Sequence, residues 1–511
     1  MIGGRAAEWS NMIRIYDTRM HKKVDFTPLE HGKVKMYVCG PTVYNYIHIG
    51  NARTFISFDV IRRYLAWRGF DVVFVQNVTD VDDKIIAKAN EEGRSAEEVA
   101  KEYTAAFIED MHAVNVMDPT VRPKATKEIG TMIALVKQLI EKGHAYATED
   151  GDVYFNVRSF PSYGSLSGRN IDEMEAGHRD LRTEGIEDRK NDPLDFALWK
   201  AAKPGEPAWD SPWGQGRPGW HIECSCMSKK YLGLPFDIHG GGADLVFPHH
   251  ENERAQSEAA TGTTFANHWM HGGMLQINGE KMSKSLDNFF LLRDILETVD
   301  ANVLRFLMLQ THYRSPLDFS DERVEEAGVA LERIKNTVKT LDWAIQNAAG
   351  DDGIIDADEV ANLVREARKN FIVSMDDDFN SPKALGQTFD CVGAVNALVA
   401  GKTLSVADAE AVRPLRELIV ELMGVFGIDL EAVLAADQDG SEYPVEVVAL
   451  AKELAGYEGD DTAEAVRALL DVRAEARASK NWGVADAVRD GMADLGFVIK
   501  DTPQGVQVSL A

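Results

Sequence analysis

The first hundred residues carry the hydrophobic pattern of a strand, a helix and a second strand. Residues 33–39 alternate into an apolar run, which predicts a strand ending at Gly40. Residues 52–68 repeat apolar side chains at helical spacing, and Gly69 follows as a stop signal. The apolar residues 72–75 predict a second buried strand. Such a βαβ unit binds its ligands at the carboxyl ends of the strands, beside the start of the helix.

Residues 125–214 interrupt this pattern and are predicted to be an insertion. Apolar residues at helical spacing predict a helix over 129–140, and Asp150 with Gly151 predicts the turn of a hairpin. The end of the insertion, residues 203–219, is rich in Pro, Gly and Trp and is predicted to be a loop.

Beyond residue 321 the pattern is helical for more than a hundred residues. Apolar side chains recur at intervals of three and four at Leu331, Ile334, Val338, Leu341 and Ile345. Ser381 followed by Pro382 predicts the start of a further helix. A linker rich in acidic residues and glycine, 437–443, precedes a small C-terminal module.

The predicted fold class is therefore α/β, with a Rossmann-like parallel sheet that carries an insertion, followed by a helical bundle and a C-terminal module. The predicted boundaries are 12–124 and 215–320 for the two halves of the α/β domain, 125–214 for the insertion, 321–436 for the bundle and 444–511 for the module.

Composition narrows the class of protein. With 45% apolar and 27% charged residues among 511, the chain is neither disordered nor fibrous. Residues 1–11 are polar and predict no secretory signal, and no apolar run approaches the roughly 18 residues of a membrane-spanning helix. Four cysteines are too few for a disulfide scaffold. These features predict a cytoplasmic protein without a membrane partner.

The net charge of −27 is the opposite of the broad basic surface that nucleic-acid binding by charge alone requires. A polyanionic partner would therefore have to bind local basic strips set in a repelling acidic surface.

Two segments have the composition of a nucleotide site. Residues 48–51 (HIGN) lie between the first strand and its helix, where free N–H groups and the helix dipole favour phosphate. Residues 281–285 (KMSKS) offer two ammonium groups to a triphosphate whose leaving pyrophosphate gains charge. A chance match and a solvated lysine loop are the competing interpretations. Together, in this order, the segments predict ATP binding by His48, Gly50, Asn51, Lys281, Ser283 and Lys284.

A third group has the chemistry of a metal site. Cys39 lies at the end of the first strand, and a helix over 249–253 would place His249 and Glu253 on one face. With Cys224 they make a tetrahedral zinc set of two thiolates, an imidazole and a carboxylate. His250, three residues before Glu253, is an alternative to His249. The remaining cysteines, Cys226 and Cys391, are interpreted as small buried apolar residues.

Several segments in order resemble one family, the cysteinyl-tRNA synthetases, which are class I aminoacyl-tRNA synthetases. Residues 37–44 (YVCGPTVY) resemble its opening signature, residues 48–51 its HIGH motif and residues 281–285 its KMSKS motif. The resemblance also covers 77–84, 219–225, 237–253, 375–380 and the C-terminal module, so it extends over nearly the whole chain from Met12.

The resemblance implies an enzyme that uses ATP and Mg²⁺ to activate L-cysteine as cysteinyl adenylate and transfers the cysteinyl group to the 3′ end of tRNA(Cys). It implies that Cys39, Cys224, His249 and Glu253 hold one zinc ion, to which the substrate thiolate binds. Such coordination selects cysteine over serine without an editing domain. It also implies catalytic roles for His48, Asn51, Lys281 and Lys284, and a cysteine pocket of Gly40, Thr79, Trp220, His239 and Asp244.

The resemblance further implies that the insertion contacts the tRNA acceptor end and that the C-terminal module binds the anticodon. Basic and aromatic side chains there suit splayed bases, although a solvated helix face is the competing interpretation. The implied tRNA-binding residues are Arg473, Arg477 and Lys480, at helical spacing, with Trp482, Asp486 and Asp501. We expect a monomer.

Two features depart from the family pattern. Asn51 replaces the last histidine of the generic HIGH motif, and the chain ends without a basic tail. The main alternative function is the ATP-dependent ligase of mycothiol synthesis, which joins cysteine to an amino sugar and lacks the C-terminal module. A non-enzymatic tRNA- or zinc-binding protein is disfavoured because both ATP motifs are intact.

Overall fold

The computed structural model describes residues 12–170, 190–277, 279–281, 290–439, 443–502 and 505–510. The chain divides into two compact units. Unit 1 comprises residues 1–331, 369–386 and 425–428, and unit 2 comprises residues 332–368, 387–424 and 429–511. Among the described residues, no helix is both long enough and apolar enough to cross a membrane.

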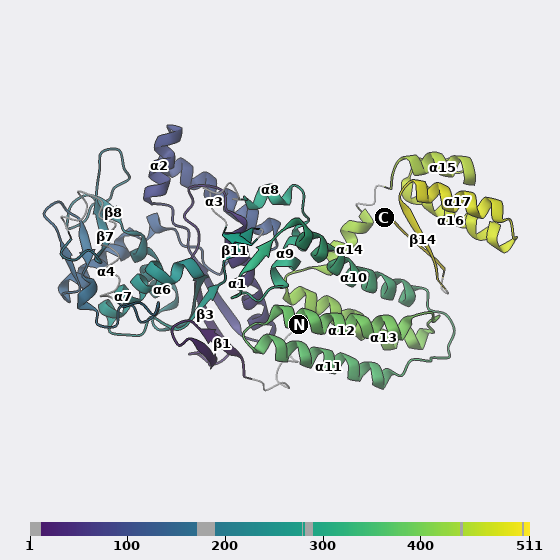
Figure 1. Cartoon of the computed structure of the whole chain (residues 1–511), viewed down its shortest axis with the longest axis horizontal. Coiled ribbons are helices and arrows are strands. Elements are labelled where there is room, and N and C mark those ends of the chain that lie inside the picture. The colour runs from purple at the N-terminus through teal and green to yellow at the C-terminus, as the bar shows by residue number, and fades with distance from the viewer. Residues whose placement is uncertain are drawn as a thin grey trace. The chain divides into compact units, whose positions relative to one another are not determined.

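A parallel sheet of four strands, in the order β10–β9–β3–β4, forms the centre of unit 1 (Figure 1). Its strands are β3 (Lys33–Val38), β4 (Asp71–Gln76), β9 (Phe236–Gly242) and β10 (Ala266–Gly272). Helix α1 (Ile49–Trp67) connects β3 to β4, which confirms the predicted βαβ unit and the Rossmann-like fold class. The helix begins at Ile49 instead of the predicted residue 52, because His48 caps it.

The insertion contains an antiparallel sheet in the order β5–β6–β7–β8. Its elements are α4 (Ile129–Glu141), β5 (Ala145–Ala147), β6 (Val153–Phe155), β7 (Phe196–Ala201) and β8 (Gly216–Pro218). The predicted helix and hairpin are confirmed, but the prediction of a loop through residue 219 is wrong at β8. Proline is tolerated there because β8 is an edge strand, and a side chain at Gly216 would lie 2.3 Å from the carbonyl oxygen of Lys200.

The core of the insertion continues into the helices behind the central sheet. Met132 and Leu135 of α4 share one apolar cluster with Ile222 and Cys226 of α6 (Trp220–Leu232) and with Ala255 of α7 (Glu251–Thr261). Cys226 is therefore a core residue. Helix α6 also contributes to the apolar cluster that covers the central sheet. Helix α7 contacts β9 through the hydrogen bond between Glu253 and His239.

The remaining elements of unit 1 surround this centre. They are β1 (Arg14–Asp17), β2 (Lys22–Asp25), α2 (Asp83–Glu92), α3 (Ala96–Ala113), η2 (Ala125–Lys127), η3 (Val157–Ser159), η5 (Ala243–Leu245), η6 (Val246–His250), β11 (Leu275–Ile277), β12 (Glu280–Lys281), α8 (Leu292–Leu296), α9 (Ala301–Leu309) and β13 (Leu317–Phe319).

After residue 321 the described chain is helical as far as the C-terminal hairpin, as predicted. The long helices are α10 (Asp321–Gln346), α11 (Ala357–Asp376), α12 (Ser381–Val399) and α13 (Val406–Val425), followed by α14 (Leu430–Asp439). In α10 the predicted apolar positions are buried up to Leu341, whereas Ala344 is buried in place of Ile345. Helix α12 begins at Ser381, as the Ser-Pro pair predicts.

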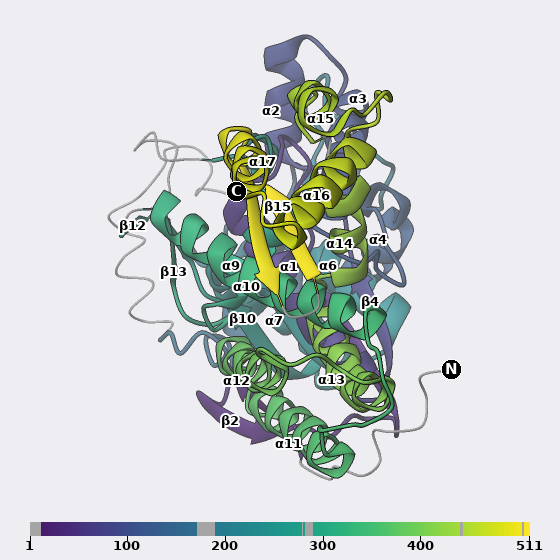
Figure 2. The ribbon, with the colours of Figure 1, turned by 90° about the vertical axis from the view of Figure 1, so that its right-hand side faces the viewer.

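The C-terminal module packs three helices and a hairpin around its own core. Its elements are α15 (Glu446–Ala455), α16 (Thr462–Ala478), α17 (Trp482–Asp494), β14 (Phe497–Thr502) and β15 (Gly505–Leu510). The three helices contact one another and β14 contacts α17 (Figure 2). Val447, Leu469, Val488 and Phe497 form the centre of this core.

Candidate active site

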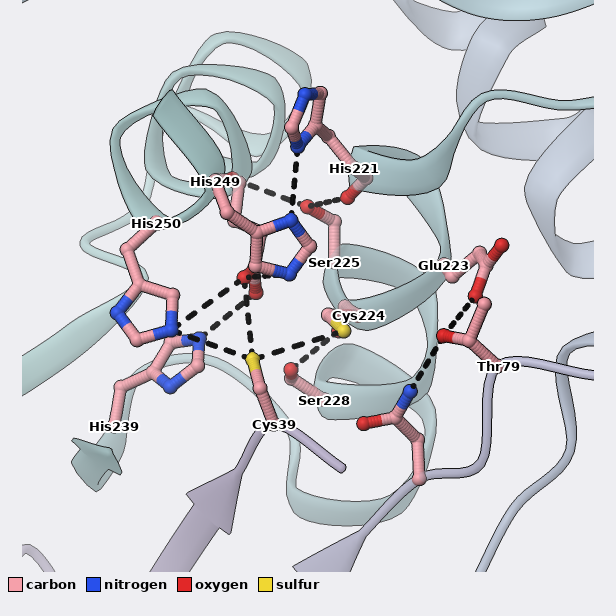
Figure 3. A network of polar contacts seen from close by, with 12 residues as sticks. Cys39, Thr79, His221, Glu223, Cys224, Ser225, Ser228, His239, His249 and His250 are labelled. Carbon is pink, nitrogen blue, oxygen red and sulfur yellow. Dashed lines mark hydrogen bonds and ion pairs between the residues drawn. The ribbon is translucent and has the colours of Figure 1, made fainter. Parts of the chain in front are cut away.

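Four buried side chains that could hold a metal ion meet at the carboxyl end of β3 (Figure 3). Cys39 follows β3, Cys224 lies on α6, His249 on η6 and Glu253 on α7. One ligand atom of each lies within 4.8 Å of the others. The structure thus brings together the four residues that the sequence predicts as zinc ligands. We call them the metal set.

A π-helical turn presents the histidine of this set. The η6 segment leads directly into α7, with a break at Phe247, whose φ of −141° and ψ of 132° are not helical. After the break, the predicted spacing of His249 and Glu253 is observed, with His249 Nε2 lying 2.9 Å from Glu253 Oε1. Both side chains have ligand atoms within reach of those of Cys39 and Cys224.

The distances within the metal set fit zinc. Two thiolates bound at about 2.3 Å to a tetrahedral zinc ion are about 3.8 Å apart. The Sγ atoms of Cys39 and Cys224 are 3.8 Å apart, and Cys39 Sγ lies 3.5 Å from Glu253 Oε1. Thiolate, imidazole and carboxylate are the ligand types that zinc takes in proteins.

A second group shares half of the metal set. Cys39, His239, His250 and Glu253 also have ligand atoms within 4.8 Å of one another. His250 Nε2 lies 3.3 Å from Cys39 Sγ but 4.0 Å from Glu253 Oε1. His239 Nε2 lies 2.8 Å from Glu253 Oε2. We favour the first group because it offers two thiols in place of one, and thiolate is the softer ligand.

The ionisable side chains of the metal set shift the pKa values of one another. Burial raises the pKa of Cys39 well above its usual range, with its hydrogen bond to Cys224 acting in the same direction. Burial opposes ionisation of Cys224, but the hydrogen bond from Cys39 and the contact with His249 lower the Cys224 pKa to about 6. Burial also opposes protonation of His249, yet the Glu253 carboxylate raises its pKa to about 10. A bound cation would replace the protons held on Cys39 and His249.

Further histidines orient the rings around the metal set. His221 Nδ1 lies 2.9 Å from His249 Nδ1, which leaves Nε2 of His249 toward the set. His271 Nε2 lies 2.7 Å from His250 Nδ1. Neither partner is among the site residues predicted from the sequence. His221 precedes Cys224 by three residues on α6, so helical spacing was a usable signal, whereas His271 comes from β10 without any local signal.

Three residues of the predicted cysteine pocket border the metal set. Trp220 stacks on His249 with 4.1 Å between ring centroids. Gly40 follows Cys39 and must lack a side chain, because a Cβ there would lie 1.7 Å from the carbonyl oxygen of Asn77. Thr79 donates a hydrogen bond of 2.8 Å to Glu223, the residue before Cys224.

The other two residues of the predicted cysteine pocket are His239 and Asp244. His239 contacts the Glu253 carboxylate and belongs to the second metal-binding group. Asp244 is exposed, and its Oδ1 borders Gly242 at the place where Thr54 of α1 also approaches. Asp244 therefore lies toward α1, where the nucleotide motif begins.

The first nucleotide motif caps α1. His48 Nδ1 accepts from the backbone N–H of Asn51 at 3.2 Å, and Asn51 Oδ1 accepts from the N–H of His48 at 3.3 Å. This reciprocal cap holds both side chains at the helix N-terminus, where Gly50 lies in the first turn. Of the second motif, the structure describes only the backbone of Lys281, in β12. Ser283 and Lys284 lie outside the described residues.

The three basic residues predicted to form one tRNA-binding strip lie in different environments. Arg473 is buried on the core side of α16, Arg477 is exposed, and Lys480 lies beyond the end of the helix with a φ of 60°. The expectation of one exposed helical strip is therefore wrong, because α16 ends at Ala478. Trp482 is 57% exposed.

Two acidic residues complete the predicted tRNA contacts. Asp486 forms an exposed ion pair with Arg489, at 3.0 Å between Oδ1 and Nη1. The backbone of Asp501 lies in β14, and its side chain is outside the described part of the structure.

Three family models match the chain in order. Residues 25–329 match the class I (C) tRNA synthetase catalytic domain, residues 370–431 the DALR domain, and residues 459–508 the cysteinyl-tRNA ligase anticodon binding domain.

Solved structures share the fold at low sequence identity. A methionyl-tRNA synthetase of Mycobacterium tuberculosis in complex with methionyl-adenylate has a TM-score of 0.58 and 16% identity, covering 80% of this chain and 92% of that one. A leucyl enzyme (LeuRS) of Agrobacterium radiobacter, in a ternary complex with tRNA, has a TM-score of 0.57 and 13% identity, covering 80% and 86%.

Curated relatives are much more similar. A Cysteine–tRNA ligase of Desulfitobacterium hafniense is 48% identical over 503 residues, which cover 98% of this chain and 99% of the relative. Another, of Pelotomaculum thermopropionicum, is 48% identical over 97% of this chain and 99% of its own length. With this similarity over nearly the full length, and with the catalytic and anticodon-binding domain matches, the chain belongs to the cysteine–tRNA ligase family of class I tRNA synthetases.

Proposed function

We propose that this chain is an ATP-dependent cysteine–tRNA ligase that selects L-cysteine at a zinc ion held by Cys39, Cys224, His249 and Glu253. The observation that carries the proposal is the buried metal set, whose spacing fits zinc, at the carboxyl end of β3 in a class I synthetase fold. A zinc ion there supplies a position that binds a thiolate far better than a hydroxyl.

The chain's own residues orient the two reactants. Trp220, Gly40 and Thr79 border the metal set and hold the cysteine, while His48 and Asn51 hold ATP-Mg²⁺ at the start of α1. The cysteine carboxylate attacks the α-phosphate and pyrophosphate leaves. Lys281, Ser283 and Lys284 bind the leaving phosphates. A ribose hydroxyl at the tRNA 3′ end then attacks the carbonyl carbon of the cysteinyl adenylate, which forms the cysteinyl ester and releases AMP. Catalysis rests on positioning and charge stabilisation, without a covalent enzyme intermediate.

The insertion and the C-terminal module bind the tRNA. The insertion, residues 125–214, contacts the acceptor end, and the module from residue 444 binds the anticodon loop. Exposed Arg477, Lys480 and Trp482 offer charge and a stacking surface to unpaired bases. Asp486 and Asp501 accept from base amino groups. We retain the predictions of a monomer and of a cytoplasmic location.

The amino-sugar ligase alternative finds no support. That enzyme lacks a C-terminal anticodon module, whereas residues 459–508 of this chain match the cysteinyl-tRNA ligase anticodon binding domain.

Pyrophosphate exchange with the zinc-loaded full chain tests the proposal. We expect exchange that depends on L-cysteine and is absent with L-serine, followed by charging of tRNA(Cys) and no ligation to an amino sugar. Exchange with L-serine as good as with L-cysteine would refute selection by the metal set.

A further inference from the structure

A buried chain of hydrogen bonds runs beside the metal set (Figure 3). The backbone N–H of Gly40 donates to Asn77 Oδ1 at 2.8 Å, and Asn77 Nδ2 donates to Thr79 Oγ1 at 3.3 Å. Thr79 Oγ1 donates in turn to Glu223 Oε2 at 2.8 Å. Asn77, Thr79 and Glu223 are all buried. The chain begins next to Cys39 and ends next to Cys224.

The order of these bonds determines where the Thr79 proton points. Because the Gly40 N–H can only donate, it holds the oxygen of the Asn77 amide toward itself and the NH₂ group toward Thr79. The Thr79 oxygen must then accept from Asn77, so its own proton is directed at Glu223. A hydroxyl has one proton and two lone pairs, which leaves one lone pair on Thr79 for a further donor.

Glu223 lowers the stability of the fold if its role is only structural. It is fully buried, and its second oxygen, Oε1, has no hydrogen-bond partner among the described residues. A buried carboxyl group that makes a single hydrogen bond costs stability compared with an apolar side chain of similar size. A buried polar group of this kind needs a reason other than packing.

We propose that Glu223 is a positioning residue for recognition of the substrate's amino group: by accepting the Thr79 proton, it keeps the Thr79 oxygen as an acceptor for the α-ammonium of the amino acid. The ammonium has only donors to offer, so it binds an oxygen whose proton is turned away. The assignment holds for an ionised Glu223 and for a protonated one whose proton is on Oε1, because Oε2 then still accepts from Thr79. It rests on the proposed function, since it needs a cysteine thiol at the neighbouring metal set.

The test compares L-cysteine with 3-mercaptopropionate, which keeps the thiol and the carboxylate but lacks the amino group. The experiment uses zinc-loaded full-length variants whose zinc content is measured. In these variants 3-mercaptopropionate is assayed as a competitive inhibitor of cysteine-dependent pyrophosphate exchange. Glu223→Leu should weaken L-cysteine binding at least about tenfold, as expected for a hydrogen bond to a charged group, with inhibition by 3-mercaptopropionate unchanged. Glu223→Gln keeps an acceptor oxygen for Thr79 and should recover most of the lost affinity.

A double-mutant cycle with Thr79→Val separates positioning from packing. If Glu223 acts through Thr79, the Glu223→Leu/Thr79→Val double variant binds L-cysteine no more weakly than Thr79→Val alone. Additive losses, or an equal loss of affinity for both thiols, would overturn the proposal. If Glu223→Leu does not fold, Glu223→Asp, whose carboxylate is one methylene too short to reach Thr79, takes its place with the same expectation. A wild-type enzyme without cysteine-dependent exchange would instead refute the proposed function.

Discussion

The metal set and the exposed residues of the C-terminal module show two ways of building a binding site. Cys39, Cys224 and the pair His249 and Glu253 come from three separate parts of the chain, and all four are buried. Arg477, Lys480 and Trp482 lie within a few residues of one another and are all exposed. The metal set is enclosed by α6, α7 and the sheet, whereas the module presents side chains on the surface of a small independent core.

The two sites should differ in how much activity is lost when one residue is replaced. In the metal set the loss of one ligand leaves the remaining buried charges without compensation, so its effects should be large and shared by every activity that needs cysteine. Exposed contacts to a single-stranded loop are screened by water and salt, so their effects should be smaller and restricted to tRNA. Four predictions test this contrast.

Replacing one thiol of the metal set should have the largest effect. We expect Cys224→Ser to lose zinc and to lower cysteine-dependent pyrophosphate exchange at least about 100-fold, because two thiolates hold the ion. Metal analysis and exchange assays measure both. Cys226→Ser is the matched control, since Cys226 lies two positions away on α6 but in the apolar cluster, and this variant should keep its zinc. A Cys224→Ser enzyme with full zinc content would contradict the ligand set.

Zinc affinity should rise steeply with pH. Cys39, whose pKa is raised by burial, and His249, whose pKa is raised to about 10, both hold protons at neutral pH, so a cation must displace them. The apparent dissociation constant should fall about tenfold per pH unit for each proton displaced. Below pH 6 the affinity should weaken further, because Cys224, whose pKa is about 6, is then also protonated. Competition with a chelator between pH 5.5 and 8 measures this slope, and a flat profile would mean that the protons lie elsewhere.

Removing the exposed indole ring of Trp482 should weaken only the interaction with tRNA. We expect Trp482→Ala to raise the KM for tRNA(Cys) about tenfold, the cost of one lost stacking contact, while pyrophosphate exchange stays unchanged. Charging and exchange assays on the same preparation measure the two activities. Val445→Ala, at another exposed position of the module, is the control and should change neither. Equal losses in both assays would show that the tryptophan supports the fold.

The two arginines of α16 should differ, although they are one turn apart. Arg477→Ala removes an exposed charge and should weaken tRNA binding by a few fold. It should also lower the slope of the logarithm of the binding constant against the logarithm of the salt concentration by about one, as expected for one lost phosphate contact. Arg473→Ala removes a buried side chain and should lower the melting temperature of the chain instead. Binding at several salt concentrations and thermal unfolding distinguish them. Identical behaviour of the two variants would restore the single strip predicted from helical spacing.

Local patterns predicted much of the fold. The βαβ unit, the helix of the insertion, the hairpin after residue 145 and the helix starting at Ser381 follow from periodicity and from capping residues, which act over a few positions. Strand β8 was missed because glycine and proline disfavour a strand locally, and only its pairing with β7 makes the three residues extended. The buried side of α16 was missed because helical spacing cannot say which face meets a core.

The sequence by itself determined which chemical groups this protein has available: the His48 cap beside a helix start, the His249 and Glu253 pair at one helical turn, and the ordered motifs of its family. Only the tertiary structure decided that Cys39 and Cys224, from distant parts of the chain, lie 3.8 Å apart, that His221 and His271 orient the rings, and that Glu223 holds Thr79. The reason is physical: helical spacing and capping act over a few residues, whereas contacts between distant segments arise only when the sheet and its helices pack and bury them together.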